Sequence, residues 1–201
     1  MKKSILTLAI VLVSVLGISK SAFAATNSHD AITVLNDISN INKIEVHGNV
    51  ELYLSGGTSD QVKVYNSYYS ENALVQNQNG VLKISSYKAQ KLVVWVTVSN
   101  LSNLSVYDNA QVKSFGKLSA IELSVKLYNN ASVQLNMDAY SVSMKLNDHA
   151  KADIEGNVTE AELGYDYSAC LNITNLNSER LVKKVNLDYP ANNEKDTLVI
   201  L

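Results

Sequence analysis

The sequence is poor in the residues that build disulfides and metal sites. It contains one cysteine, Cys170, so no internal disulfide can form, and this residue is expected to be a small core hydrophobe. The three histidines lie far apart, and no His-x-x-x-His or Cys/His spacing of the kind that binds zinc is present. We therefore expect no metal-binding residues and no cofactor.

Catalytic signatures are missing as well. The chain has one arginine, Arg180, and neither a Gly-x-Ser-x-Gly nucleophile motif nor a phosphate-binding loop. Polysaccharide lyases and glycoside hydrolases need a base with charge-neutralising groups, or two carboxylates that face one bond. We predict a noncatalytic protein without catalytic residues. Because a site can be assembled from distant residues, a carbohydrate-active enzyme is kept as the third alternative.

Residues that would interrupt regular structure or separate domains are also scarce. Pro190 is the only proline, and no Pro/Gly/Ser-rich linker divides the sequence, so residues 25–201 are expected to form a single domain. No stretch of a dozen residues repeats its apolar positions every 3.6 residues, whereas apolar and polar residues alternate almost throughout. The sequence therefore predicts an all-β protein.

The chain begins with the pattern of a secretory signal peptide. Lys2-Lys3 precede an apolar run from Ile5 to Ile18, and Ser21-Ala22-Phe23-Ala24 places small residues at positions −3 and −1 of a cleavage site. The apolar run is shorter than the about 20 residues of a membrane span, which favours cleavage of residues 1–24 over an uncleaved anchor. We expect an exported protein, periplasmic or extracellular, that is soluble after cleavage and has no membrane span.

The net charge limits the choice of partners. Residues 1–24 contain three of the 17 basic residues and none of the 19 acidic ones, which leaves 14 bases, 19 acids and a formal charge of −5. Binding to a phosphate backbone needs a basic surface that releases counterions. Nucleic acid is therefore not an expected partner.

The pattern from about residue 31 to residue 100 predicts short strands. Apolar residues alternate on both sides of His47-Gly48-Asn49, which indicates two strands joined by a tight turn. Asn79-Gly80 between two strand-like segments predicts a hairpin, because both residues tolerate the positive φ of a type I′ turn. Leu92–Val96 is apolar without alternation, so we expect a strand covered on both faces, or the boundary with the second half of the chain.

From residue 101 to residue 187 the sequence repeats itself. Ala110, Ala131, Ala150 and Ala169 follow one another at intervals of 21, 19 and 19 residues. At offsets of −6, −4, +2 and +4 from these alanines nearly every residue is apolar, and even offsets place side chains on one face of an extended chain. In the order of the offsets, these residues are Leu104, Val125, Met144 and Leu163; Val106, Leu127, Leu146 and Tyr165; Val112, Val133, Ala152 and Leu171; and Ser114, Leu135, Ile154 and Ile173.

One repeat of about twenty residues cannot bury its apolar face alone, whereas stacked repeats align equivalent residues in columns. We predict a short parallel (right-handed) β-helix of about four C-terminal rungs, preceded by the N-terminal strands (about 31–100) and followed by a C-terminal tail (188–201). An antiparallel meander is the alternative. It is less favoured because no Asn-Gly or Asp-Gly turn recurs after Gly80.

Over about residues 38 to 187 the sequence resembles the head GIN domain family. The similar segments are Ile44–Gly48, Glu51–Leu54, Val62–Val64, Asn79–Ile84, Val94–Val98 and the repeats that open at Leu104-Ser105-Val106. The family comprises exported bacterial proteins, frequent in Bacteroidetes, that are described as autotransporter adhesin heads and as a domain of unknown function. Its members usually have Ser-Gly-x-Gly-like turns, which are replaced here by Tyr107–Ala110, Tyr128–Ala131, Asn147–Ala150 and Tyr167–Ala169. The resemblance implies an adhesin-like binding function.

Polar turn residues form one candidate site. Stacking would align Asp108, Asn129 and Asp148 on one edge, and would place Asn109, Asn130 and His149 beside them. Oxygen atoms in register could hold a hard cation such as calcium. Asp and Asn in turns usually bond the backbone, however, and stacked amides form ladders. We interpret the column as structural and leave ion binding open.

Tyrosine forms the second candidate site. Tyr107 and Tyr128 share one outward offset, and tyrosine surfaces suit sugar rings and protein partners. The next members of that column are Asn147 and Asp166, so the aromatic strip ends after two repeats. We interpret it as an ordinary strand surface.

The resulting hypothesis is a noncatalytic adhesin-like binding module, secreted or in the cell envelope, whose partner is a surface glycan or an envelope protein. An architectural or self-assembling envelope protein is the alternative, and oligomer formation stays open. The strands between Ile44 and Ile84 are expected to lie outside the repeat frame and to cover one end of the coil. Leu181–Leu187 is expected to form the final strand, and the apolar Thr197–Leu201 to cover the core or to join another subunit.

Overall fold

A computed structural model of the protein describes residues 32–35, 38–65 and 73–186. These residues form fourteen strands and no helix, which confirms the all-β prediction. A helix long and apolar enough to cross a membrane is accordingly not found in this part of the chain. The predicted signal peptide and the segment Thr197–Leu201 lie outside the described residues.

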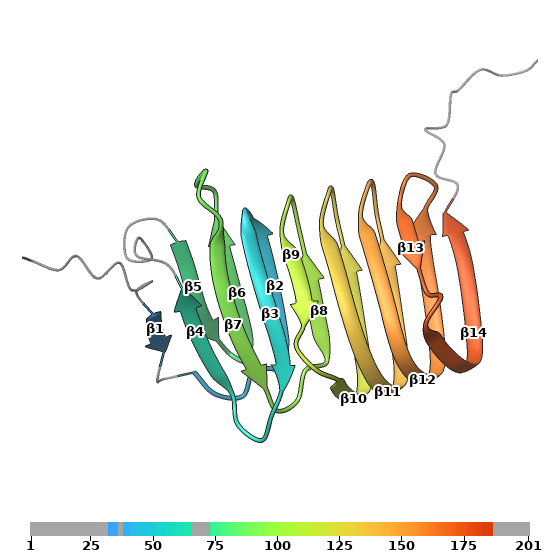
Figure 1. The fold of residues 1–201 in the computed structure, drawn as a ribbon, viewed down its shortest axis with the longest axis horizontal. Helices are drawn as coiled ribbons and strands as arrows, with labels where there is room; N and C mark the ends of the chain where they lie inside the picture. The colour runs from blue at the N-terminus through green and yellow to red at the C-terminus, as the bar shows by residue number, and fades with distance from the viewer. Residues whose placement is uncertain (1–31, 36–37, 66–72, 187–201) are drawn as a thin grey trace, which may run out of the picture.

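All fourteen strands belong to one mixed sheet that curls strongly, so that the molecule is a row of rungs (Figure 1). The strands are β1 (Ile32–Leu35), β2 (Lys43–Gly48), β3 (Val50–Gly56), β4 (Gln61–Tyr65), β5 (Ala73–Gln78), β6 (Val81–Ser86), β7 (Leu92–Val98), β8 (Asn103–Val106), β9 (Gln111–Ser114), β10 (Leu118–Leu127), β11 (Ser132–Leu146), β12 (Lys151–Asp166), β13 (Cys170–Asn172) and β14 (Leu176–Asn186).

The repeats pair in parallel and in the register that the alanine spacing predicts. Leu127 of β10 lies opposite Leu146 of β11, which lies opposite Tyr165 of β12. The column at offset +2 also pairs as expected, with Val112 opposite Val133 and Val133 opposite Ala152. An antiparallel meander of the repeats is therefore wrong.

The two longest strands bend and take part in two flanks of the curled sheet. Residues 132–134 of β11 pair with β9, whereas residues 137–146 of the same strand pair with β10. We call β1, β4, β7, β3, β9, the first parts of β11 and β12, and β13 the first flank. We call β5, β6, β2, β8, β10, the second parts of β11 and β12, and β14 the second flank.

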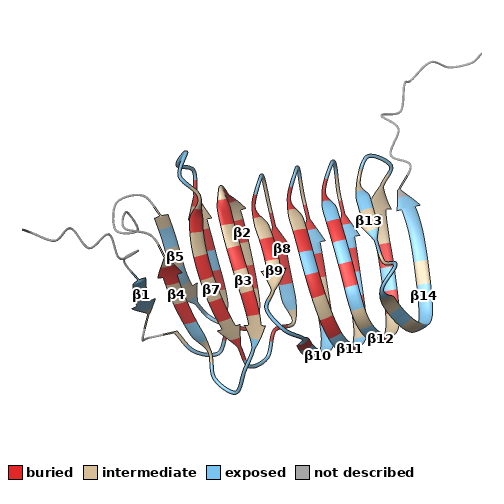
Figure 2. Cartoon of the chain, viewed as in Figure 1, coloured by how far each residue is buried: buried red, intermediate tan, exposed pale blue. Residues whose placement is uncertain are grey.

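The inward side chains of both flanks form one hydrophobic core. Figure 2 shows the alternation of buried and less buried residues along the strands. Leu104, Val125, Met144 and Leu163, which form one column, are at most 2% exposed. Since burial of one such side chain contributes about 1.5–3 kcal/mol, these columns supply most of the stability of the stack.

Four of the N-terminal strands, β2, β3, β6 and β7, follow the same frame as the repeats, contrary to the expectation from the sequence. The others, β1, β4 and β5, pair antiparallel and cover one end of the stack, as expected for β4 and β5. Val46 of β2 lies opposite Val106 of β8, and Leu52 of β3 lies opposite Val112 of β9. The pair β6 and β7 adds a further rung, because β2 pairs in parallel with β6 and β3 with β7. In space β2 and β3 lie between β6/β7 and β8/β9 (Figure 1), so the order of the rungs differs from the order of the chain.

Two further predictions for the N-terminal half have different outcomes. Asn79 and Gly80 have φ values of 51° and 79° and join antiparallel β5 and β6, which confirms the hairpin. The prediction that Leu92–Val96 is covered on both faces is wrong, because burial alternates along β7 and Trp95 is half-buried on the outer face. Nor does β7 form the boundary with the repeats, since it pairs with β3 and β4.

The C-terminal end of the stack is less covered than the centre. β14 pairs with β12 along Leu176–Asn186, which confirms that the segment beginning at Leu181 continues the final strand. Among the described residues no strand lies on its other side, and Leu181 and Val185 are 42% and 47% exposed. Cys170 is exposed in β13 instead of buried in the core, because its odd offset from Ala169 turns it outward.

Candidate functional site

The structure brings Asp108, Asn129 and Asp148 together, in a hydrogen-bonded ladder of turns. All three residues have φ near +60°, a conformation that Asn and Asp tolerate better than most residues. Asp148 Oδ2 accepts a hydrogen bond from the Asn129 N–H at 2.9 Å, and Asp108 Oδ1 accepts one from Asn129 Nδ2 at 3.1 Å. The Gly48 N–H donates to Asp108 Oδ2 at 3.1 Å. These oxygen atoms therefore already bind the polypeptide and connect adjacent rungs.

The residues beside this ladder also bind neighbouring turns. The Asn130 side chain donates to Asn109 Oδ1 at 3.4 Å, and the His149 N–H donates to the Asn129 carbonyl at 3.0 Å. Within the described ranges, no group of three or more His, Cys, Asp or Glu residues is placed to hold a metal ion. These hydrogen bonds give the column a structural role in the turns.

Tyr107 and Tyr128 lie side by side, and His47 extends their row by one rung. The ring centroids of the two tyrosines are 4.7 Å apart and those of His47 and Tyr107 are 4.3 Å apart, with interplanar angles of 2° in both pairs. The ring faces therefore cover one another, and Tyr107 has no free face on which a sugar ring could stack. This row stabilises the second flank and is a poor binding platform.

A second aromatic group lies on the outer face of the first flank, and the sequence analysis missed it. Tyr53 of β3 and Trp95 of β7 lie opposite each other with ring centroids 4.8 Å apart. Tyr65 of β4 and Phe115, which follows β9, pack against Trp95 at 6.3 and 5.3 Å in tilted orientations. We call these four residues the aromatic cluster. Phe115 is 64% exposed, so the cluster presents apolar surface to the solvent.

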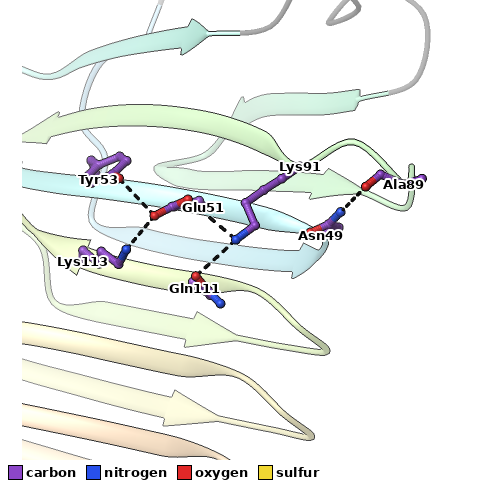
Figure 3. A network of polar contacts seen from close by, with 7 residues as sticks. All are labelled: Asn49, Glu51, Tyr53, Ala89, Lys91, Gln111 and Lys113. Atoms are coloured by element: carbon purple, nitrogen blue, oxygen red, sulfur yellow. Dashed lines mark hydrogen bonds and ion pairs between the residues drawn. The ribbon is translucent and has the colours of Figure 1, made fainter.

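An ion network centred on Glu51 adjoins the aromatic cluster (Figure 3). Glu51 Oε1 accepts hydrogen bonds from Lys113 Nζ at 2.7 Å and from the Tyr53 hydroxyl at 3.0 Å. Lys91 Nζ lies 3.7 Å from Glu51 Oε2 and donates to Gln111 Oε1 at 3.3 Å. Two neighbouring strands, β3 and β9, and Lys91, the residue before β7, thus hold the network in place, and Tyr53 connects it to the aromatic cluster.

The network fixes the charges of its members at neutral pH. The hydrogen bond from Lys113 is the main reason why the pKa of the Glu51 carboxyl is lowered. The same bond raises the pKa of Lys113, and the bond to Glu51 raises the pKa of the Tyr53 hydroxyl. Glu51 is therefore a carboxylate beside an ammonium group, and the pair has no net charge.

A groove extends from the aromatic cluster across the rest of the first flank. It consists of two adjoining hollows of about 420 and 390 Å³ that share Lys113, Gln134 and Asp153. Tyr53, Phe115, Asn136 and Glu155 line the hollow at the aromatic end; Gln111, Ser132, Lys151, Cys170 and Asn172 line the other one. We call this combined depression the groove.

Hydrogen bonds hold several polar groups of the groove in fixed positions. Its two carboxylates each accept an amide hydrogen bond at 2.9 Å, Asp153 from Asn172 and Glu155 from Asn136. Amides, carboxylates and ammonium groups held in this way can donate to and accept from the hydroxyl groups of a ligand. Exposed aromatic surface at one end offers apolar contact. Only the outward alternation of these strands was a signal in the sequence, because the residues come from five strands.

Solved structures share the fold at low sequence identity. A protein described as "putative lipid binding protein" from Parabacteroides distasonis has a TM-score of 0.62, 11% identity and coverage of 79% of each chain. A "putative adhesin" from the same species has a TM-score of 0.58 and 15% identity, with 78% of this chain and 79% of that chain covered. A "putative adhesin" from Parabacteroides merdae has a TM-score of 0.57, 14% identity and coverage of 77% of each chain.

Sequence comparison gives the family. No curated protein matches the chain significantly. Residues 40–186 match the sequence profile of the family described as "Putative auto-transporter adhesin, head GIN domain". This match spans most of the chain and agrees with the resemblance of the strands and repeats. The protein therefore belongs to the head GIN domain family of adhesin-like proteins.

Proposed function

We propose that this protein is an exported, noncatalytic adhesin-like module that binds a surface glycan through the outer face of the first flank. The observation that carries the proposal is the aromatic cluster at one end of a polar groove. Membership in an adhesin-like family supports a binding function. The two neighbours described as "putative adhesin" agree with it.

A sugar offers a protein two kinds of contact, apolar C–H groups and polar hydroxyl groups. Sugar rings present C–H groups that pack on aromatic side chains, and Tyr and Trp give a large contact at a low entropic cost. Their hydroxyl groups need polar partners at defined positions, which pockets usually supply through a few amide and charged groups. The groove places Gln134 in such a position beside Tyr53 and Phe115, and Asn172 at its other end.

We propose cleavage after Ala24, release into the periplasm or the extracellular space, and a single domain from residue 25 to residue 201. The parallel, in-register rungs support a short right-handed β-helix. The chain uses no cofactor and no metal in this scheme.

A glycan array probed with the exported chain tests the function, with Trp95→Ala and Phe115→Ala as variants. We expect the wild type to bind a subset of glycans, and each variant to lose about tenfold or more in affinity, as residues at the centre of a binding surface usually do. Tyr128→Ala, in the stacked row of the second flank, is the matched control and should bind like the wild type.

Melting temperatures show whether a variant has lost binding because it has lost its fold. Phe115 is the more exposed of the two residues, so Phe115→Ala should keep the fold even if Trp95→Ala does not. If no glycan binds, or if Phe115→Ala binds like the wild type, the proposal is wrong. Capture of an envelope protein that depends on Phe115 would instead assign this face to a protein partner.

Self-assembly is the second candidate function, and the open end of the stack favours it. β14 has no strand on its outer edge among the described residues, and Leu181 and Val185 are partly exposed there. Unpaired strand edges associate readily, although Lys183 and Lys184 oppose this. Sedimentation of the exported chain should show a concentration-dependent increase in mass if it assembles, and a constant monomer mass would exclude assembly as its function.

A further inference from the structure

We infer that the ligand is a linear, uncharged polysaccharide that lies along the groove, across the strands, with successive sugars on successive rungs and one end on the aromatic cluster. This inference rests on the proposed function and adds the class and the direction of the ligand. It follows from the register, shape and charge of the groove.

The register aligns the outward side chains of the first flank in two columns, and each strand contributes one residue to each column. Tyr53 lies opposite Lys113, and the same column continues through Gln134, Asp153 and Asn172. Adjacent strands are about 4.8 Å apart, so these groups repeat at that interval along a line perpendicular to the strands. A second column beside the first one contains Glu51, Gln111, Ser132, Lys151 and Cys170.

An extended polysaccharide presents its hydroxyl groups at a similar regular interval, because each sugar ring advances the chain by a length comparable to the strand spacing. A chain parallel to the row of rungs would therefore meet about one side chain of each column per sugar. A chain parallel to the strands would meet only two or three outward side chains before the short strand β9 ends at Ser114. The register favours the first direction.

The shape of the groove agrees with an elongated ligand. Its two hollows adjoin at Lys113, Gln134 and Asp153, and together they reach from Phe115 to Asn172. An extended peptide would instead gain most from pairing with the edge of a sheet. The groove lies on a face of the sheet, where the backbone groups of β9 and β11 already pair with neighbouring strands.

The charge of the groove favours an uncharged chain. Lys113, Lys151, Asp153 and Glu155 are the charged residues among its lining, two of each sign. Lys113 is also paired with Glu51 at 2.7 Å. An anionic polysaccharide would need a surplus of basic groups, as any polyanion does, and the groove offers none.

Length dependence of binding tests the inference. The probes are linear β-1,4-linked oligomers of glucose, of mannose and of N-acetylglucosamine, from two to six sugars long, titrated calorimetrically into the exported chain. We expect at least one series to gain affinity with each added sugar, by about tenfold in total between the shortest and the longest oligomer. Polygalacturonate oligomers, which are anionic, should bind more weakly than the neutral series.

Asn172→Ala provides the matched variant, because Asn172 lies four rungs from Tyr53 in the same column. It should weaken binding of the longest oligomer about fivefold or more and leave the shortest unchanged, whereas Ser143→Ala on the second flank should change neither. Equal affinities for short and long oligomers, or tighter binding of polygalacturonate, would overturn the inference while leaving a glycan-binding function in place. Failure of all three neutral series would also overturn it, whereas the proposed function fails only if the glycan array is negative or if Phe115→Ala binds like the wild type.

Discussion

The central rungs and the last rung have the same sequence frame but very different environments. In the centre, Leu127 and Leu146 are fully buried between neighbours on both sides. In the last rung, Val185 continues that column and is 47% exposed, and Lys183 continues the column of Met144 and Leu163. The position of a residue in the repeat thus decides whether its side chain points inward or outward. Whether an inward side chain is buried depends on a neighbouring rung on each side.

This difference shows how a stacked sheet distributes its stability. The apolar side chains of a central rung pack against a neighbouring rung on both sides, whereas those of the end rung pack against a neighbour on one side only. A charged residue such as Lys183 is tolerated at an inward position only where solvent can reach it. Four predictions test the stacked architecture and the contrast between its centre and its end, from the largest expected change in stability to the smallest.

The largest contrast is expected for leucine. Leu146→Ala removes a fully buried side chain and should lower the free energy of unfolding by about 2–5 kcal/mol. Leu181→Ala in the last rung should cost only about 1 kcal/mol, because Leu181 is already 42% exposed. Urea unfolding measures both, and Lys145→Ala on the outer face should cost less than about 0.5 kcal/mol. Equal costs at Leu146 and Lys145 would show that the register is wrong.

The second prediction concerns close backbone approach at the bend of the central rungs. A Cβ at Gly156 would lie 2.1 Å from the Met137 carbonyl oxygen, and the residue has a φ of +108°. Gly156→Ala should therefore cost about 2–4 kcal/mol through strain and displacement of β11. Gly164→Ala is the control on the same strand, since its Cβ would make only an ordinary contact of 3.8 Å with the Met144 carbonyl oxygen. Thermal unfolding should show little change for Gly164→Ala, and a similarly small change at Gly156 would contradict the bend geometry.

The third prediction compares a central turn with the last one. Asp148→Ala removes the acceptor of the Asn129 N–H and places alanine at a φ of 57°, which should cost about 1–2 kcal/mol. Tyr167 occupies the equivalent position of the last turn and is 86% exposed, so Tyr167→Ala should cost less than about 0.5 kcal/mol. If the turn column is structural, calcium or EDTA should leave the melting temperature of the wild type unchanged. A rise of several degrees with calcium would revive the ion-binding interpretation.

The smallest effect is expected for two ion pairs of nearly equal length. Lys113–Glu51 and Lys184–Glu162 have Nζ–Oε1 distances of 2.7 and 2.6 Å, but the Glu51 side chain is 15% exposed and that of Glu162 is 56% exposed. The folded-state pKa of Glu51 is lowered from its ordinary value of 4.5. Its charge therefore stabilises the folded state above that pH by about 1 kcal/mol at most, and this contribution disappears as the pH falls through the lower pKa.

The measurement is the melting temperature against pH for the wild type, Glu51→Gln and Glu162→Gln. The difference between wild type and Glu51→Gln should be greatest above pH 5 and vanish in stronger acid. Glu162→Gln should differ little from the wild type at any pH, although Lys184 lowers the pKa of Glu162 too, because the exposed pair is screened by solvent. If the difference in melting temperature between the wild type and Glu51→Gln grew as the pH fell, the Glu51 carboxylate would not stabilise the folded state as predicted.

The repeat frame, the inward columns and the Asn79-Gly80 hairpin were predictable because they depend on local rules. Alternation with period two decides which face a side chain takes, and Asn-Gly decides the turn. The same rules could not show that β2 and β3 belong to the stack. Their in-register partners in the repeats, β8 and β9, begin 60 and 61 residues after β2 and β3, and the strands β4 to β7 lie between them in the sequence.

The candidate site was less predictable than the fold. Tyr107 and Tyr128 were one candidate in the sequence, and Asp108, Asn129 and Asp148 were the other, and both groups were interpreted as structural; in the structure the tyrosines cover each other and the Asp and Asn residues bind the turns. Tyr53, Trp95 and Phe115 were not predicted, because no pattern joins residues that are 42 and 20 positions apart. Their outward direction was readable, but their contact was not.

The sequence by itself determined the all-β character, the inward or outward direction of each repeat residue, and the turns whose Asn and Asp residues have positive φ. Each of these depends on a few adjacent residues and their steric preferences. Only the tertiary structure decided which strands are neighbours, which rungs are covered on both sides, and which outward side chains meet across the first flank. The physical reason is that parallel pairing depends on apolar columns that match over long distances in the sequence. Any strand with a matching apolar pattern can extend such a column, whatever its position in the sequence.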